Sequence, residues 1–384
     1  MATIEKRDIE SLLQHEGWPA ISIYMPVSRI GDQQDPLRYK KIITEVTNRL
    51  INEGMRAPEA RSLLEPEFAL MSDADYWKHL GADGLAVFLA GQAVWRYPLP
   101  HSFAELVMVG RRLHIRPLLP LLTGGPYLVL ALSRKKMQLF RGDRYQLEEI
   151  ALPEGTPKSM DDALQYDDPQ RHLQFHTKTG TSRGQRDAMF HGHGMGFDDQ
   201  NEDLVRYLQA IDRVLFPRLE EEKMPIILAG TEELHAGYRN ITKSRTVLSR
   251  GIAGNVGELS PETLHRKAWA IALDYFTEEE RQAVGTYQDN LGGDRVVDEL
   301  QSVMTAAFDG RVDHLFVAEN AQIWGRFDPD KRQVSVQKPD EYDGALVDLL
   351  DEAVYWTLQK KGTVFIKTRD AMPVDRVVCA LLRY

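Results

Sequence analysis

The sequence predicts an α/β fold divided into three domains. Helix-like and strand-like segments alternate along the chain, a pattern that excludes an all-helical bundle and an all-β sandwich. The chain has 384 residues, too many for one ordinary core when a domain takes about 150. With 43% hydrophobic and 27% charged residues, the composition excludes global disorder. We expect domains at 1–122, 123–256 and 257–384.

The first domain is predicted to hold a strand, a helix and a hairpin before a proline-rich boundary at 117–126. The helix begins where Asp35 can act as N-cap and Pro36 as the first helical residue. Gly91 and Gln92 separate two apolar runs and form the predicted hairpin turn. The expected segments are a strand at 20–25, a helix from 35 through 50, and hairpin strands at 84–90 and 93–98.

The second domain is predicted to combine a meander with a glycine-rich loop at 178–198 and a long helix. The helix is capped by Asp198 or Asp199, and Pro217 weakens its last turn. Its buried stripe is Leu204, Leu208, Ile211, Leu215 and Leu219. The expected strands are 127–133, 136–140 and 145–152 in the meander, a further one at 172–176, and 225–230 in a parallel sheet.

The third domain is predicted to be a mixture of helices and strands. Its first helix is predicted to begin with Ser260 as N-cap and Pro261 as the first helical residue. Cys379 lies in an apolar run, which indicates a core thiol rather than a catalytic one. The expected segments are helices at 261–276, 296–308 and 344–360 and strands at 312–318, 322–327, 363–367 and 376–382.

Local charge is segmented in a way that the formal net charge of −10 conceals. The net value excludes a histone-like coat of nucleic acid, yet 171–186 and 237–251 contain basic residues and no acid, and 134–144 holds five bases against one acid. Such runs favour an anionic partner, since Arg and Lys make phosphate contacts. The candidate RNA-binding residues are Arg171, Lys178, Arg183, Arg186, Arg239, Lys243, Arg245 and Arg250.

Histidines 172, 176, 191 and 193 gather in and before the glycine-rich loop. Neutral imidazoles are common zinc ligands, so a metal site is one interpretation. The sequence His191-Gly-His193 places both rings on one face only in an extended chain, and no cysteine lies nearby. We therefore expect no metal and no cofactor, and we expect the loop to contact RNA or solvent. No phosphate-binding glycine motif occurs either.

The N-terminus and the longest uncharged stretch predict where the protein acts. The first residues are mixed in charge and lack the apolar core of a secretory signal. The uncharged stretch 117–133 contains three prolines and two glycines, which a membrane-spanning helix would not tolerate together. We expect a cytoplasmic protein without a membrane partner.

Four segments, in this order, carry a resemblance to a known family. They are Gly110–Pro120, His191–Gly194, Pro225–Gly230 and Val364–Tyr384. They resemble the bacterial branch of the archaeo-eukaryotic release factor superfamily, specifically its type 3 family; the superfamily includes Pelota-type rescue factors and Balon-type hibernation factors. The resemblance implies a divergent first domain, a ribonuclease-H-like middle domain, and a last domain similar to the kink-turn-binding ribosomal proteins.

The resemblance also points to the loop as a functional segment. In release factors a Gly-Gly-Gln loop of the middle domain reaches the peptidyl transferase centre and promotes ester hydrolysis. This chain contains no Gly-Gly-Gln, and its nearest approach is Arg183-Gly184-Gln185, with His191-Gly-His193 beyond it. The resemblance thus makes Gln185, His191 and His193 candidate catalytic residues, while the missing glycine puts peptide release in doubt.

The resulting expectation is a ribosome-associated, release-factor-like protein in ribosome rescue, translation quality control or hibernation. Its partners would be ribosomal RNA and tRNA, with a translational GTPase as a further candidate. The alternative is a hydrolase, either a peptidyl-tRNA esterase using Gln185 or a metal-dependent enzyme built on the histidines. A third interpretation, an interaction scaffold, would use the acidic run 340–352 as its surface. Whether the protein is an enzyme stays open at this stage.

Overall fold

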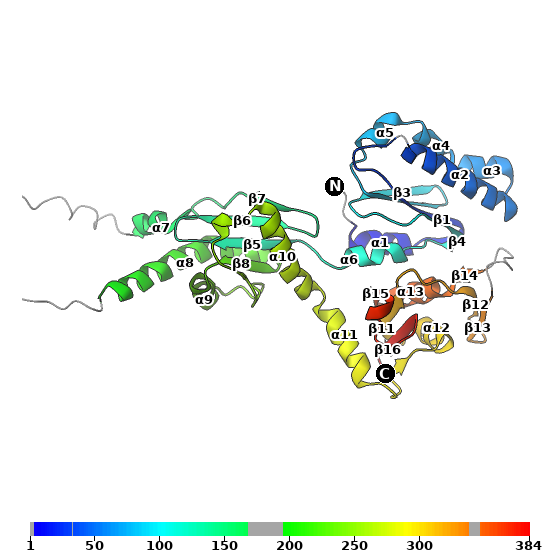
Figure 1. Cartoon of the computed structure of the whole chain (residues 1–384). Helices are drawn as coiled ribbons and strands as arrows, with labels where there is room; N and C mark the ends of the chain where they lie inside the picture. The colour runs from blue at the N-terminus through cyan, green and yellow to red at the C-terminus, as the bar shows by residue number, and fades with distance from the viewer. Residues whose placement is uncertain (1–3, 33, 168–194, 338–345) are drawn as a thin grey trace, which may run out of the picture. The chain divides into compact units, whose positions relative to one another are not determined.

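The computed structural model describes residues 4–32, 34–167, 195–337 and 346–384. The chain divides into two compact units. Unit 1 joins the two ends of the chain, Met1–Thr123 and Glu278–Tyr384, and unit 2 is the stretch Gly124–Thr277. Sheets and helices occur in both units, so the predicted α/β class is confirmed (Figure 1).

The N-terminal part of unit 1 is an antiparallel sheet in the order β3-β2-β1-β4. Side chains on β1 alternate between two cores: Ile21 and Ile23 pack toward α2, whereas Tyr24 packs in the other core. The elements are α1 (Lys6–Leu13), β1 (Glu16–Pro26), α2 (Gln34–Asn52), α3 (Ala57–Leu63), α4 (Glu65–Met71), α5 (Ala74–His79), β2 (Gly84–Ala90), β3 (Ala93–Leu99), β4 (Leu106–Arg112), the short 3₁₀ turn η1 (Arg116–Leu118) and α6 (Leu119–Leu122).

Two predictions for this part concern a hairpin turn and a helix N-cap. The hairpin around Gly91 is confirmed, because β2 and β3 pair from Ala90–Ala93 onward. The N-cap role given to Asp35 is wrong: α2 already begins at Gln34. The Asp35 carboxylate instead accepts a 2.8 Å hydrogen bond from the Ser28 amide, so it fastens the loop before the helix.

The C-terminal part of unit 1 has a four-stranded sheet in the order β10-β16-β11-β15 and a small sheet in the order β13-β12-β14. In the larger sheet β11 runs parallel to β15 and antiparallel to β16. The elements are α11 (Glu278–Asp289), β10 (Val296–Val297), α12 (Leu300–Phe308), β11 (Val312–Ala318), β12 (Trp324–Asp328), β13 (Gln333–Val336), β14 (Val347–Asp348), α13 (Leu349–Gln359), β15 (Thr363–Lys367), the 3₁₀ turn η5 (Arg369–Ala371) and β16 (Val378–Leu382).

The predicted bounds here hold for two strands and fail for two helices. Strands β11 and β15 have the predicted bounds. The helix predicted over 296–308 is wrong at its start, because Val296 and Val297 pair with β16 and the helix begins at Leu300. Helix α11 was not predicted, since among its twelve residues only Ala283 and Tyr287 are buried and the apolar period is weak.

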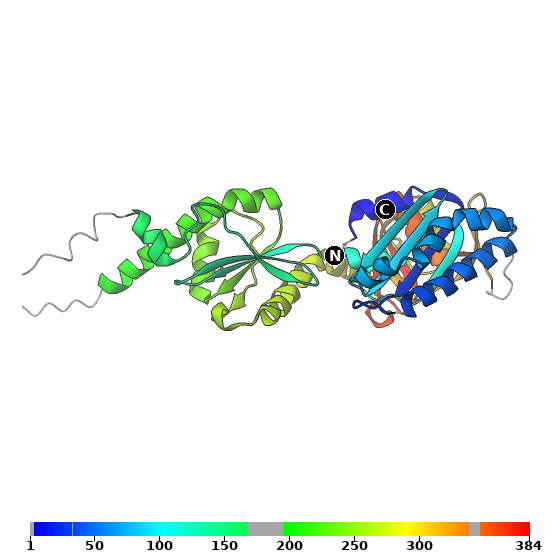
Figure 2. The ribbon, with the colours of Figure 1, turned by 90° about the horizontal axis from the view of Figure 1, so that it is seen from above.

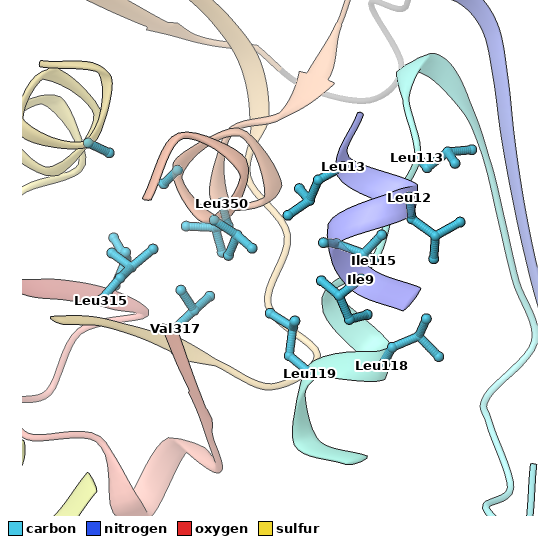
Figure 3. Packing of buried hydrophobic residues seen from close by; sticks show 14 of the residues in the cluster. Ile9, Leu12, Leu13, Leu113, Ile115, Leu118, Leu119, Leu315, Val317 and Leu350 are labelled. Carbon is cyan, nitrogen blue, oxygen red and sulfur yellow. The ribbon is translucent and has the colours of Figure 1, made fainter. Parts of the chain in front are cut away.

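The two parts of unit 1 share one hydrophobic core. Figure 3 shows Ile9 and Leu12 of α1 with Leu118 and Leu119 in the neighbouring turn, facing Leu350 of α13 and the strand residues Leu315 and Val317. All of these side chains are nearly or completely buried. Residues from opposite ends of the chain therefore fold as one unit.

Unit 2 is a five-stranded mixed sheet in the order β7-β6-β5-β8-β9. Among the described strands only β6 runs against the others, an arrangement that agrees with the ribonuclease-H-like expectation. Helices α7, α8 and α9 cover one face and α10 the other (Figure 2). The elements are β5 (Tyr127–Leu132), β6 (Met137–Gly142), β7 (Leu147–Ile150), α7 (Met160–Asp167), α8 (Met195–Glu222), β8 (Ile226–Gly230), α9 (Glu232–Ile241), β9 (Ile252–Ala253), the 3₁₀ turn η3 (Val256–Glu258) and α10 (Pro261–Phe276).

Helix α8 confirms the predicted buried stripe but not the predicted ends. It begins at Met195, before Asp198 and Asp199, and it continues through Pro217 to Glu222. The stripe Leu204, Leu208, Ile211, Leu215 and Leu219 is buried against the sheet.

Helix α10 belongs to unit 2. The Ser260 hydroxyl accepts a hydrogen bond from the Thr263 amide at 3.3 Å, so the predicted N-cap is confirmed. The buried side of α10, including Leu264 and Ala268, packs on Val129 of the sheet. Because α10 covers the second face of this sheet, unit 2 extends to Thr277, beyond the boundary at 256 predicted for the middle domain.

Candidate nucleic-acid interface

Residues 168–194, between α7 and α8 in the sequence, include most of the predicted glycine-rich loop and lie outside the described residues. Helix α7 ends at Asp167, α8 begins at Met195, and the two helices pack side by side on the same face of the sheet. The candidate catalytic residues Gln185, His191 and His193 lie outside the described residues, as do Arg171, Lys178, Arg183 and Arg186 and the strand predicted at 172–176.

The other candidate RNA-binding residues lie in or just before a segment, residues 242–250, at the edge of the unit 2 sheet. After α9 the chain returns along β8: the Ile226 amide donates to the Thr246 carbonyl, and the Leu248 amide donates to the Ile226 carbonyl, both at 2.8 Å. The segment then joins β9, which runs parallel to the end of β8. Main-chain hydrogen bonds of Thr246 and Leu248 therefore hold the segment 242–250 to the sheet.

Lys243 and Arg245 are the two exposed cations of this segment that carry unbalanced charge. Neither makes an ion pair within the described part of the chain. The surrounding sequence contains no acid from 234 to 257. A loop with this charge, fixed along a sheet edge, can approach phosphate groups with little ordering of the backbone.

Arg239 and Arg250 have different roles. The Arg239 side chain is half-buried, and its Nε donates to the Leu248 carbonyl at 3.3 Å, so it holds the segment from beneath. Arg250 forms an ion pair with Asp274 of α10, which offsets its charge. The structure thus brings the four predicted residues 239, 243, 245 and 250 together but leaves two of them free to meet an anion.

His235 lies under the same segment and is only 5% exposed. Burial lowers its pKa, and the neighbouring Arg239 lowers it further, so the imidazole is neutral at pH 7 and adds no charge to the surface. Residue 251 packs closely on His235 and has no room for a side chain. A Cβ at residue 251 would come within 2.6 Å of the Leu228 carbonyl oxygen and 2.9 Å of the His235 ring.

The acidic run 340–352, the surface assumed by the scaffold interpretation, is largely internal where the structure describes it. Asp348 is 3% exposed. Two ion pairs connect this run to the end of β4 and the segment after it, Arg112 with Glu352 and Arg116 with Asp348. The His114 Nδ1 atom lies 3.1 Å from the Asp351 carboxylate. Asp348 and Glu352 of the run thus pair within the chain, while Asp340, Glu341 and Asp343 lie outside the described residues.

The described residues contain no group of three or more His, Cys, Asp or Glu side chains that could hold a metal ion. Cys379 is completely buried, and burial raises the pKa of its thiol to about 12, as expected of a core cysteine. No helix in the described ranges is long and apolar enough to cross a membrane.

Residues 127–274, nearly all of unit 2, match the family model of bacterial archaeo-eukaryotic release factor family 7. The resemblance to the bacterial archaeo-eukaryotic release factors is thereby confirmed over this segment, although the matched family is number 7 and not type 3. No curated protein matches the chain.

Solved structures that resemble the chain include archaeal translation termination factor aRF1, at 14% identity, covering 100% of this chain and 99% of that chain with a TM-score of 0.24. Archaeoglobus fulgidus Pelota has 14% identity, 78% and 79% coverage, and a TM-score of 0.30. Archaeal Pelota in a ribosome-bound model with ABCE1 has 10% identity, 78% and 77% coverage, and a TM-score of 0.39. Scores this low carry no statement about function.

Proposed function

We propose that this protein, release-factor-like over residues 127–274, binds the ribosome and acts in rescue, translation quality control or hibernation. The observation that supports the proposal is the coincidence of two features in unit 2. The segment that matches a release factor family is also the one that presents Lys243 and Arg245, unbalanced, along a rigid sheet edge.

Binding through these residues is an electrostatic mechanism. Cations that neutralise RNA phosphates release counterions, so the affinity falls steeply as salt is raised. The formal charge of the chain is −10, which opposes unspecific binding to RNA. Binding therefore depends on local surfaces, of which the segment 242–250 is one.

Ribosome co-sedimentation across a salt series tests the proposal. The double variant Lys243→Glu, Arg245→Glu should bind at least about tenfold more weakly at moderate salt, because two phosphate contacts become repulsive. The matched control is Arg266→Glu, Lys267→Glu, which reverses the same number of exposed charges on α10 of the same unit. If both variants bind as the wild type does, the segment has no role; if the folded wild type does not bind even at low salt, the ribosomal proposal is wrong.

A further inference from the structure

Unit 1 presents a second concentration of positive charge, whose residues are far apart in the sequence. The parallel strands β11 and β15 begin at the same edge of the C-terminal sheet, and the antiparallel strand β16 ends there (Figure 1). Short strand β10 also begins at this edge, because it pairs antiparallel with β16. Each of these strand ends carries a cation: Arg295, Arg311, Lys360, Lys361 and Arg383, here called the basic edge.

Main-chain carbonyls hold the arginines of the basic edge in place. Arg383 donates to the carbonyls of Gly310 and Lys360 at 2.9 and 2.8 Å, which ties the turn before β11 to the turn before β15. Arg295 donates to the Leu382 carbonyl through Nη2 at 3.3 Å. Since a carbonyl orients a guanidinium without cancelling its charge, the edge is both ordered and positive.

Two of the carboxylates that stand closest in the sequence to the cations of the basic edge contact other side chains. Asp309 pairs with Arg332 at 3.0 Å, and Asp313 lies 3.3 Å from His314. Asp294 is exposed beside Arg295, and Asp313 has a histidine partner that is charged only when protonated, so two acids stand against five cations. A carboxylate at residue 384 would remove one further charge, and the edge would still be positive.

An exposed aromatic ring accompanies the cations. Tyr384 is 72% exposed, and the Arg311 guanidinium lies 5.7 Å from the centre of its ring. Cations for phosphates beside a ring on which a base can stack are the combination that nucleic-acid surfaces use. An acidic protein would need the cations but not the exposed ring.

We propose that the basic edge of unit 1 is an RNA-binding surface that contacts the phosphate backbone, with Tyr384 stacking on an unpaired base. The basic edge belongs to unit 1, whereas Lys243 and Arg245 belong to unit 2. The charges and contacts that support it involve no residue of unit 2. The proposal therefore does not rest on the proposed function of the segment 242–250.

The test measures binding of the full chain to deproteinised ribosomal RNA across a salt series. Lys360→Gln, Lys361→Gln keeps the main-chain carbonyl that Arg383 uses and removes two exposed charges. The matched control is Lys40→Gln, Lys41→Gln, an equally exposed lysine pair on α2 of the same unit. We expect the first variant to lose about fivefold or more in affinity and to flatten the salt dependence by up to about two phosphate equivalents, with no change in the control.

Other outcomes overturn the proposal. Equal affinities of the two lysine variants for the RNA would show that the edge does not contact it. Weaker co-sedimentation with whole ribosomes but unchanged binding to the deproteinised RNA would assign the edge to an acidic ribosomal protein.

Tyr384→Ala should weaken binding to an unpaired RNA strand more than to a duplex. Because Lys243→Glu, Arg245→Glu is measured in parallel, failure of one surface is distinguishable from failure of the other.

Discussion

Arg116 donates a 2.9 Å hydrogen bond to the carboxylate of Asp348, although 232 positions separate them along the chain. Both side chains are at most 6% exposed. Asp348 also accepts the Leu350 amide at the start of α13, so one carboxylate caps this helix and joins it to the segment after β4. This pair is one of the polar contacts that join the two parts of unit 1.

Removing the cation of this pair should destabilise unit 1. Arg116→Met leaves the Asp348 carboxylate buried without its cation, which costs about 3 kcal/mol or more. Adding Asp348→Asn should recover part of the loss, because the amide oxygen still caps α13 and no charge remains buried. Denaturant unfolding followed by tryptophan fluorescence measures the effect, since five of the six tryptophans lie in unit 1.

The control for this prediction is Arg29→Met, which breaks an exposed pair with Asp83 and should cost less than about 1 kcal/mol. Acid supplies a second check. Burial raises the pKa of Asp348, so protonation of the native state begins above its unfolded pKa. Arg116 opposes this rise, so its removal raises the folded pKa of Asp348 further, and the penalty in Arg116→Met should shrink as the pH falls through that folded value. A loss equal to that of Arg29→Met, independent of pH, would contradict the importance of the buried pair.

The contact between distant chain segments explains where sequence reasoning reached its limit. Strands β5, β8 and β11 could be predicted because continuous apolar runs mark buried strands. The pairing of Arg116 with Asp348 depends on tertiary folding, and nothing local in the run 340–352 distinguishes a buried carboxylate from a solvated one. The segment of α10 was recognised as a helix, but a helix signal does not reveal which sheet the helix covers.

The same reasoning applies to the functional surfaces. Lys243 and Arg245 could be found because their positive run is continuous in sequence. The basic edge could not, because its cations come singly or in pairs from four chain segments that only the sheet brings together. For Arg250 the sequence predicts the charge correctly, but only the contact with Asp274 reveals that this charge is offset. Arg239 keeps its charge, but only the structure reveals that its side chain is half-buried and bound to the Leu248 carbonyl.

The buried His235 should make the stability of unit 2 depend on pH. Its folded pKa is lowered from 6.5, so the unfolded state binds the proton more readily. Stability should therefore fall as the pH drops below about 6.5, by at most about 1.4 kcal/mol per pH unit. Hydrogen exchange of peptides from α9, compared between wild type and His235→Gln at pH 7.5 and 5.5, measures this. The same change with pH in both proteins would show that another group is responsible.

Close approach of β8 to β5 should make residue 230 intolerant of any side chain. A Cβ on Gly230 would lie 2.5 Å from the Leu132 carbonyl oxygen, which is main chain and cannot turn away. Gly230→Ala should lower the free energy of unfolding by about 1–3 kcal/mol. The contrast is Gly285 of α11, where a Cβ meets nothing within 4 Å and alanine should be neutral or stabilising. Thermal unfolding of both variants tests the pair, and equal melting temperatures would count against a tight contact at Gly230.

Two mechanisms are open for the segment 178–198, ester hydrolysis and simple occupation of the site, and a peptidyl-tRNA hydrolysis assay should give opposite results for them. If Gln185 positions water at an ester, Gln185→Ala should reduce peptidyl-tRNA hydrolysis on programmed ribosomes by a large factor and leave ribosome binding intact. If the loop only occupies the site, the wild type should release no peptide, and His191→Ala with His193→Ala should change occupancy instead. We expect occupation, because the nearest match to Gly-Gly-Gln in this chain is Arg183-Gly184-Gln185, and a side chain at the first position restricts the backbone conformations that Gly-Gly permits. Release by the wild type that disappears in Gln185→Ala would establish the esterase in its place.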